Sequence, residues 1–246
     1  MNNMGYTGHR PYAVPSRPWI MRQVWQNFIF VHWPVSMESI RALVPSCLDI
    51  DTFAGQAWIG IYTFRTQGHY LRGFPSVVVF SPFYGINLRT YVTYKGKPGV
   101  YFIHLNSTHW TALRIARTWY HLNYFHAKIR FSNEGEYLVY DGIIQSHKGT
   151  SSTYHIRFSP ESMVYYPQRE TLDYFLTERY CLYSVDSKDH LYCAEIHHSP
   201  WPLQKANAEI LNNSLTKFYN LQLTNQKPVF HFSKGVDVLI WNINRL

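Results

Sequence analysis

The chain has 246 residues, of which 46% are hydrophobic, 17% aromatic and 15% charged, and its formal net charge is +8. This length allows a substantial core, and we expect residues 1–18 to form an extended N-terminal arm and residues 19–246 a single β-rich domain. The positive charge does not indicate nucleic-acid binding, because the basic residues are spread along the chain without a cluster.

The N-terminal segment is rich in Gly, Pro, Tyr and Arg and lacks the apolar stretch of a signal peptide. No apolar run reaches the roughly 18 residues needed to cross a bilayer. The three cysteines are widely spaced and form no C-x-x-C pair, which indicates neither a disulfide framework nor a zinc ribbon. We therefore expect a cytoplasmic protein without a membrane segment.

The first half of the chain predicts mainly strands. A long strand is expected over residues 19–33, ended by Pro34, and then a two-turn helix with Ser36 as its N-cap. Residues 73–85 are expected to form a loop. Further strands are predicted over residues 48–53, 57–67, 86–94 and 100–106. The last two should pair as an antiparallel hairpin, since residues 95–99 contain glycines and a proline.

The second half adds more strands and a few helices. Residues 111–120 carry apolar residues at helical spacing, and shorter helices are predicted over residues 172–179 and 206–219. Strands are predicted over residues 125–131, 137–144, 154–158, 182–185, 191–197, 229–232 and 236–241. This pattern indicates an α+β protein with predominantly antiparallel strands, in a closed or nearly closed β-barrel whose mouth admits a ligand.

Several common site motifs are absent from the sequence. There is no G-x-G-x-x-G, no P-loop, no G-x-S-x-G and no H-E-x-x-H, which removes the usual nucleotide-binding and hydrolase signatures. The thirteen histidines suggest metal binding, but none of their spacings matches an established ligand pattern. We therefore predict no metal and no cofactor.

Arg89 is the first candidate for ligand binding. In a strand, Asn87, Arg89 and Tyr91 share one face. If that face points inward, the guanidinium needs a carboxylate partner or an anionic ligand, because an unpaired buried charge is very unfavourable. Alternatively, Arg89 points outward or pairs with Glu178.

Two other polar residues have both a structural and a functional interpretation. His32 lies between aromatic residues, and its imidazole either contributes to a pocket or is satisfied within the core. Glu178 either closes a helix end and pairs with its neighbours, or donates and accepts protons.

Motifs along the chain resemble those of the YqjF-like family of unknown function, DUF2071. They are Arg17–Trp25, His32–Val35, Asn87–Val92, Phe175–Ser184 and His198–Leu203. This family is similar to acetoacetate decarboxylases, and the resemblance implies a β-rich, barrel-like fold around a pocket for small keto acids. A symmetric homo-oligomer would be typical of the superfamily.

The resemblance breaks at the residues that carry the decarboxylase chemistry. Acetoacetate decarboxylase forms a Schiff base on a lysine whose pKa is lowered by a neighbouring cation. Residues 122–127 match the lysine motif in position, and they place Tyr124 and Phe125 where the two lysines stand. Gly85 likewise occupies the position of a glutamate. A phenol cannot form an imine, so we do not expect Schiff-base chemistry.

Together these observations predict an internal aromatic pocket that binds a small organic anion of the keto or hydroxy acid type. The residues assigned to ligand binding are Trp25, His32, Asn87 and Arg89. The candidate acid–base residues, if the protein is a lyase-like enzyme, are Tyr124, His126 and Glu178. The alternative is a non-catalytic ligand-binding or sensor protein. Nucleic-acid and membrane partners are not expected.

Overall fold

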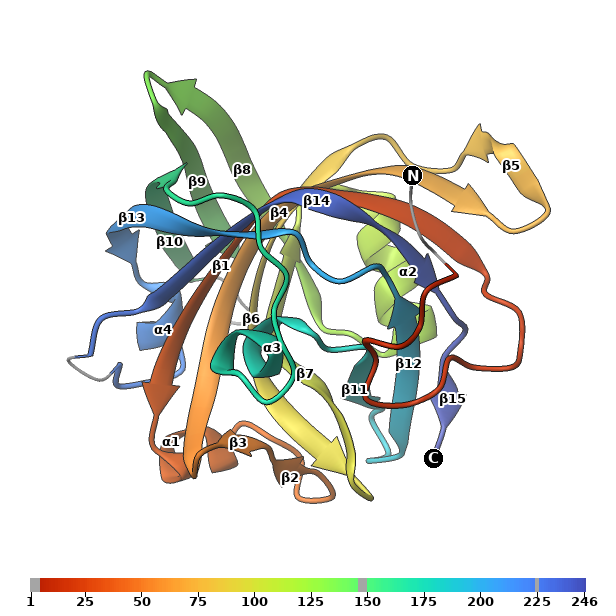
Figure 1. Cartoon of the computed structure of the whole chain (residues 1–246). Helices are drawn as coiled ribbons and strands as arrows, with labels where there is room; N and C mark the ends of the chain where they lie inside the picture. Colours follow the sequence, from red (N-terminus) through yellow and green to blue (C-terminus); the bar gives the residue numbers. More distant parts are fainter. Residues whose placement is uncertain (1–4, 146–149, 224–225) are drawn as a thin grey trace.

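The computed structural model describes residues 5–145, 150–223 and 226–246 (Figure 1). The first strands are β1 (Met21–Val35), β2 (Asp49–Ile50), β3 (Thr52–Phe53), β4 (Gln56–Leu71), β5 (Phe74–Val78), β6 (Phe83–Tyr94) and β7 (Lys97–Ser107). The later strands are β8 (Tyr124–Glu134), β9 (Tyr137–Gln145), β10 (Ser151–Pro160), β11 (Cys181–Val185), β12 (Leu191–His197), β13 (Leu203–Asn213), β14 (Val229–Ile240) and β15 (Asn244–Arg245). The helices are α1 (Met37–Arg41), α2 (Trp110–Tyr120), α3 (Leu172–Thr177) and α4 (Leu215–Phe218). Within these ranges, no helix is long and apolar enough to cross a membrane.

The strands form one continuous, mostly antiparallel sheet that closes on itself twice. One closed circuit runs through β1, β4, β6, β7, β11, β12 and β14, and we call it the cavity circuit. The other, which we call the core circuit, leaves β7 through β8, β9, β10 and β13 and returns to β14. The β7–β8 and β7–β11 pairs are parallel. The fold is therefore α+β with predominantly antiparallel strands, as predicted, and the closed circuits leave few free edges.

Strands β14, β1, β4, β6 and β7 belong to both circuits and are therefore covered on both faces. On β1, Ile29 and Val31 pack into the apolar core of the core circuit, while Phe28 and Phe30 face the cavity circuit. This arrangement follows from the alternation of side chains along a strand. It also explains why β1 and β4 read as nearly continuous apolar segments rather than as alternating ones.

A bulge in β1 interrupts the alternation of its side chains, so that residues three positions apart face the same cavity. The register of β1 shifts between Gln26 and Ile29, and Asn27 has a φ of 49°. Because the bulge adds a residue, Trp25 and Phe28 both face the cavity. Gly235 on β14 lies opposite, with a φ of 141°, and a Cβ there would clash with the carbonyl oxygen of Trp25. Only glycine allows β14 to approach β1 so closely at this point.

The structure corrects four sequence-based predictions. Most of the predicted helix over residues 206–219 is strand β13, because its backbone pairs with β10, and tertiary pairing outweighs the helix propensity of alanine, glutamate and leucine. The two strands predicted over residues 229–232 and 236–241 are one strand, β14, which continues through Gly235. Pro34 does not end β1 but lies within it. Strand β5 occupies part of the predicted 73–85 loop.

The N-terminal arm is held against the domain (Figure 1). Residues 5–18 contain no helix or strand, and residues 1–4 of the predicted arm lie outside the described residues. The Arg10 side chain is buried and donates to the carbonyl oxygen of Ile196 at 2.6 Å. The ring of His9 contacts the carbonyl oxygen of His198, with its Nε2 at 2.9 Å. The arm therefore packs onto β12 and the segment that follows it.

Candidate functional site

A cavity of about 200 Å³ lies inside the cavity circuit, and α2 covers one side of it. All seven strands of the circuit contribute side chains to its wall. The aromatic members of the wall are Trp25, Phe28, Phe30, Tyr62, Phe64, Phe80, Phe83, Phe102, Tyr120, Tyr124 and Trp201. The polar or charged members include Gln23, Thr66, Asn87, Arg89, Ser107, Thr177, Arg179 and His198. The cavity is thus mainly apolar, with a small set of polar groups, as is usual for small-molecule sites.

Arg89 projects from β6 into this cavity, on the face that the strand alternation predicts. Its Nη2 donates to the carbonyl oxygen of Leu176 at 3.1 Å, and its Cζ lies 3.8 Å from the centre of the Tyr62 ring. Its Nε is buried and makes no hydrogen bond. No carboxylate in the described part of the chain forms an ion pair with Arg89. In particular, Arg89 does not pair with Glu178.

Arg179 also borders the cavity, but its charge is paired within the protein. Its Nη1 lies 2.6 Å from Oδ2 of Asp51, and its Nε donates to the carbonyl oxygen of Phe175 at 2.7 Å. A guanidinium paired with a carboxylate adds little net charge to its surroundings. The uncompensated positive charge at the cavity wall therefore comes from Arg89.

A buried hydrogen-bond chain supports the Tyr62 ring below Arg89. The His32 Nε2 and the Tyr62 hydroxyl lie 2.6 Å apart, as do the Tyr62 and Tyr91 hydroxyls, and Tyr91 donates to the carbonyl oxygen of Leu176 at 2.8 Å. Each phenol has only one proton to donate. Because Tyr91 donates to Leu176, Tyr62 donates to Tyr91. The His32 Nε2–H then donates to Tyr62. His32 therefore lies behind the cavity wall rather than in it.

Burial sets the protonation states of His32 and Tyr62 in this hydrogen-bond chain. It lowers the pKa of His32 well below its usual value, and the nearby His231 and Arg89 lower it further. Burial also raises the pKa of Tyr62 well above the usual value for a phenol. Both groups are thus neutral at physiological pH, and their hydrogen bonds orient the ring on which Arg89 rests.

Trp25, Asn87 and Tyr124, which the sequence assigned to the site, also line the cavity. Trp25 stacks against Trp201 with ring centres 6.3 Å apart. The side-chain oxygen of Asn87 accepts from the backbone N–H of Asn106 at 3.2 Å. Burial raises the pKa of Tyr124 to about 12, so its phenol is protonated at neutral pH.

The other two acid–base candidates lie outside the cavity wall. The ring of His126 stacks on Trp110, with centres 4.4 Å apart, and partial burial and Lys128 lower the pKa of His126. Glu178 accepts hydrogen bonds from the hydroxyl of Tyr180 and, at 2.9 Å, from the backbone N–H of Trp201. Burial raises the pKa of Glu178 to about 7. Glu178 therefore anchors the segment that presents Trp201 to the cavity.

Sequence reasoning missed several members of the wall. Tyr62, Phe64 and Thr66 alternate along β4, and this spacing was a usable signal because it places them on one face. His198 follows β12, and burial lowers its pKa to about 3. The contribution of α2 had no signal, since its apolar face is equally typical of a helix packed on a sheet.

The positions that the resemblance matches to the decarboxylase lysines and glutamate carry Tyr124, Phe125 and Gly85 here. No lysine is found among the described side chains of the cavity wall. At Gly85, a Cβ would lie 2.6 Å from the ring of Phe64, so this ring fills the space that a side chain at position 85 would need. The described residues also hold no group of three or more His, Cys, Asp or Glu side chains that could bind a metal ion.

Comparisons with known proteins agree with this fold and with these motifs. The model of the DUF2071 family, "Uncharacterized conserved protein", matches residues 22–237. The "Uncharacterized protein YqjF" of Bacillus subtilis (strain 168) is 41% identical over 233 residues, which cover 95% of each chain.

Solved structures show the same fold at low sequence identity. Acetoacetate decarboxylase from Legionella pneumophila subsp. pneumophila is 13% identical with a TM-score of 0.64, and the match covers 100% of this chain and 94% of that one. The enduracididine biosynthesis enzyme MppR is 11% identical with a TM-score of 0.64 and 98% coverage of both chains. An acetoacetate decarboxylase-like enzyme from Sphingomonas wittichii RW1 is 12% identical with a TM-score of 0.61, covering 98% and 99%. The chain therefore belongs to the DUF2071 family and has an acetoacetate decarboxylase-like fold.

Proposed function

We propose that the protein binds a small organic acid in the cavity, with its carboxylate on Arg89. The observation that carries this proposal is the cavity-facing Arg89 guanidinium, which has no carboxylate partner among the described residues, beside Arg179, which is paired with Asp51. An anionic ligand would compensate this charge, and a guanidinium holds a carboxylate with two parallel hydrogen bonds. The Nε of Arg89, which makes no hydrogen bond to the part of the chain that the structure describes, is one available donor.

The cavity wall and the known ligands of related folds both favour an acid with a compact body. The aromatic wall suits an apolar or planar group, while one guanidinium without a carboxylate partner among the described residues matches a single carboxylate. MppR, which shares the fold, has been solved in complex with pyruvate, a keto acid. We therefore place keto and hydroxy acids first among the candidate ligands.

If the protein is an enzyme, Tyr124 is the acid–base candidate that borders the cavity. Its high pKa makes it a proton donor rather than a base at neutral pH. Among the described residues, the cavity wall has no lysine, which supports a reaction without a Schiff base. His126 and Glu178 retain supporting roles in this proposal, because they contact Trp110 and Trp201 respectively.

The second candidate is a non-catalytic binder or sensor that uses the same cavity. It is favoured by the commitment of Tyr62, Tyr91 and Glu178 to hydrogen bonds within the protein, which leaves few groups free for proton transfer. Turnover of a bound acid would favour the enzyme, and saturable binding without turnover would favour the sensor. We propose a cytoplasmic location in both cases.

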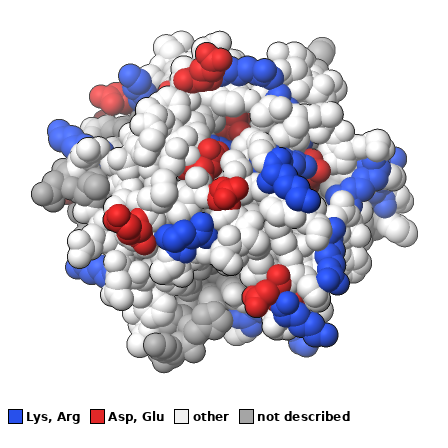
Figure 2. All heavy atoms as spheres, turned by 90° about the horizontal axis from the view of Figure 1, so that it is seen from below, with Lys and Arg blue, Asp and Glu red and all other residues white. Residues whose placement is uncertain are grey.

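The surface offers little support for nucleic acid as the partner. On the face shown in Figure 2, acidic side chains are interspersed among the Lys and Arg side chains instead of leaving one basic patch. Phosphate binding needs clustered positive charge.

A thermal-shift screen of keto, hydroxy and aromatic acids tests the proposal. At about 100 times its Kd, a ligand that binds only the native state adds about 2.7 kcal/mol, or roughly 5 to 10 °C for a protein of this size. Arg89→Met should abolish the shift while keeping the length of the side chain. Arg157→Met is the matched control, because Arg157 forms a half-exposed ion pair with Glu209 outside the cavity. No shift with any acid in the wild type, or an equal shift in Arg89→Met, would contradict the proposal.

A further inference from the structure

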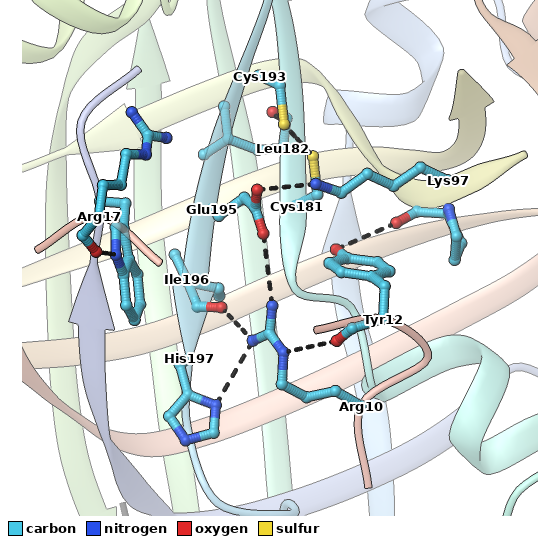
Figure 3. Close-up of polar contacts among 12 residues, drawn as sticks. Arg10, Tyr12, Arg17, Lys97, Cys181, Leu182, Cys193, Glu195, Ile196 and His197 are labelled. Atoms are coloured by element: carbon cyan, nitrogen blue, oxygen red, sulfur yellow. Dashed lines mark hydrogen bonds and ion pairs between the residues drawn. The ribbon is translucent and has the colours of Figure 1, made fainter. Parts of the chain in front are cut away.

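Cys181 and Cys193 form a contact between two buried thiols. They come from the neighbouring antiparallel strands β11 and β12, where Cys181 pairs with Glu195 and Cys193 pairs with Tyr183. The cysteines are therefore diagonal neighbours on one face of the sheet, and their sulfur atoms lie 2.6 Å apart (Figure 3). Both cysteines are at least nine-tenths buried.

The surroundings of the pair carry positive charge. The Nζ of Lys97 lies 2.8 Å from Oε1 of Glu195, and the guanidinium of Arg10 lies 3.5 Å from Oε2 of the same carboxylate (Figure 3). Two cations thus converge near one carboxylate and the two thiols. Cations beside a thiol stabilise the thiolate, which is the reactive form of cysteine.

The two thiols are not equivalent. Either thiol can donate in the contact between the two sulfur atoms, but this contact and the nearby Lys97 lower the pKa of Cys193. Burial raises the pKa of Cys181 well above its usual value. Cys181 also lines the cavity, which gives a small molecule a route to the pair. These features suit Cys193 as an attacking thiolate and Cys181 as the thiol that resolves its oxidised form.

We propose that Cys181 and Cys193 form a redox-active dithiol, which hydrogen peroxide or a similarly small hydroperoxide converts into a disulfide within the cavity wall. The Cys193 thiolate attacks one peroxide oxygen, the O–O bond breaks, and a sulfenic acid and hydroxide form. The Cys181 sulfur then attacks the sulfenic sulfur, and the S–S bond forms as the S–O bond breaks. The hydroxyl leaves as water with the proton of the Cys181 thiol. Two thiols and one peroxide thus give one disulfide and two waters.

This disulfide would join the two strands that close the cavity circuit between β7 and β14. It would form inside the domain without a large movement, since the sulfur atoms already touch. The proposal does not depend on whether the cavity binds an organic acid, because the thiol pair is defined by β11 and β12 alone.

The test uses the Cys47→Ser protein, in which the exposed third thiol is removed and the buried pair is intact. The reduced protein is treated with equimolar hydrogen peroxide, denatured, alkylated with iodoacetamide and weighed by mass spectrometry. We expect the reduced protein to take up two alkyl groups and the oxidised protein none, with a cross-linked peptide that contains Cys181 and Cys193. Dithiothreitol should restore both alkylation sites.

Alkylation before denaturation is the folding control, because two buried thiols should resist iodoacetamide in the native protein. Undiminished alkylation after peroxide, sulfinic acid without a disulfide, or a disulfide between two chains would each overturn the proposal. Adding Cys193→Ser to the Cys47→Ser protein should abolish the cross-linked peptide. A sulfenic acid trapped on Cys181 in that variant at the wild-type rate would contradict the role of Cys193 as the attacking thiol.

Discussion

The guanidinium of Arg89 lies over the ring of Tyr62, with its Cζ 3.8 Å from the ring centre, and the Tyr62 hydroxyl is in turn held by His32 and Tyr91. The ring also covers Gly60, which faces Arg89 across the β4–β6 pair and has no side chain to obstruct it. A cation on an aromatic face is stabilised by the ring quadrupole, most strongly where water is excluded. The position of the Arg89 guanidinium is therefore supported by a tyrosine whose own hydroxyl is held by His32 and Tyr91.

Tyr62→Phe keeps this ring and removes its hydroxyl. We expect a loss of about 1 to 3 kcal/mol in the free energy of unfolding, because the buried His32 Nε2–H loses its acceptor. Tyr166→Phe is the matched control, since the Tyr166 side chain is exposed and should change the free energy by less than about 0.5 kcal/mol. Urea unfolding of the three proteins measures the difference, and equal stabilities would show that the hydrogen-bond chain does not support the wall.

Glu178 should make the stability of the protein fall as the pH rises towards 7. Its folded-state pKa is raised from 4.5 to about 7 by burial, so the native state binds a proton more tightly than the unfolded state. The stabilisation is therefore complete below about pH 4.5 and is lost as the pH rises through about 7. The upper limit is about 3 kcal/mol.

Glu178→Gln should remove this pH dependence. Both proteins keep His198, whose lowered pKa acts in the opposite direction, so the difference between their unfolding free energies isolates Glu178. The measurement is urea unfolding at several pH values between 4.5 and 8. A wild type and a variant with parallel pH profiles would show that Glu178 titrates normally in the folded protein.

Gly235→Ala should be far more disruptive than an alanine substitution at another glycine with a positive φ. A Cβ at position 235 would clash with the backbone of Trp25, whereas a Cβ at Gly96 would meet no atom within 4 Å. We expect Gly96→Ala to cost about 1 kcal/mol from backbone strain and Gly235→Ala at least about 3 kcal/mol. Denaturant unfolding compares the two, and similar losses would mean that the β1 bulge adapts to the extra methyl group.

The protein should form no Schiff base with a keto acid. Incubation with pyruvate and sodium borohydride should leave its mass unchanged, because no lysine borders the described cavity wall and a phenol cannot form an imine. An acetoacetate decarboxylase treated in parallel is the positive control. Stoichiometric reduction onto one lysine of this protein would show that a lysine reaches the cavity in solution.

Much of the fold could be predicted from the sequence because the local signals agree with the tertiary structure. The β6–β7 hairpin, the β8–β9 hairpin and helix α2 lie within a few residues of their predicted positions. The alternation of side chains along β6 predicted that Asn87 and Arg89 share one face, and both line the cavity. The β13 segment was predicted wrongly because its residues favour helix in isolation, and only the pairing with β10 decides its conformation.

The site could be predicted only in part, for a geometric reason. Arg89 follows from strand alternation and Trp25 from the family motifs. The closure of the sheet through β12 and β14 brings in Trp201 and His198 from far along the chain. His32 was assigned to ligand binding; the structure places it behind the wall in a hydrogen bond to Tyr62, a contact that no local pattern encodes. Contacts between distant segments carry this information.

A crystal structure with the acid that gives the largest thermal shift would locate the ligand itself. We predict its carboxylate within hydrogen-bond distance of the Arg89 guanidinium, with its body against the aromatic wall that includes Trp25 and Trp201. A carboxylate bound elsewhere on the protein, or in the cavity but away from Arg89, would contradict the assignment of Arg89 as the anion-binding group.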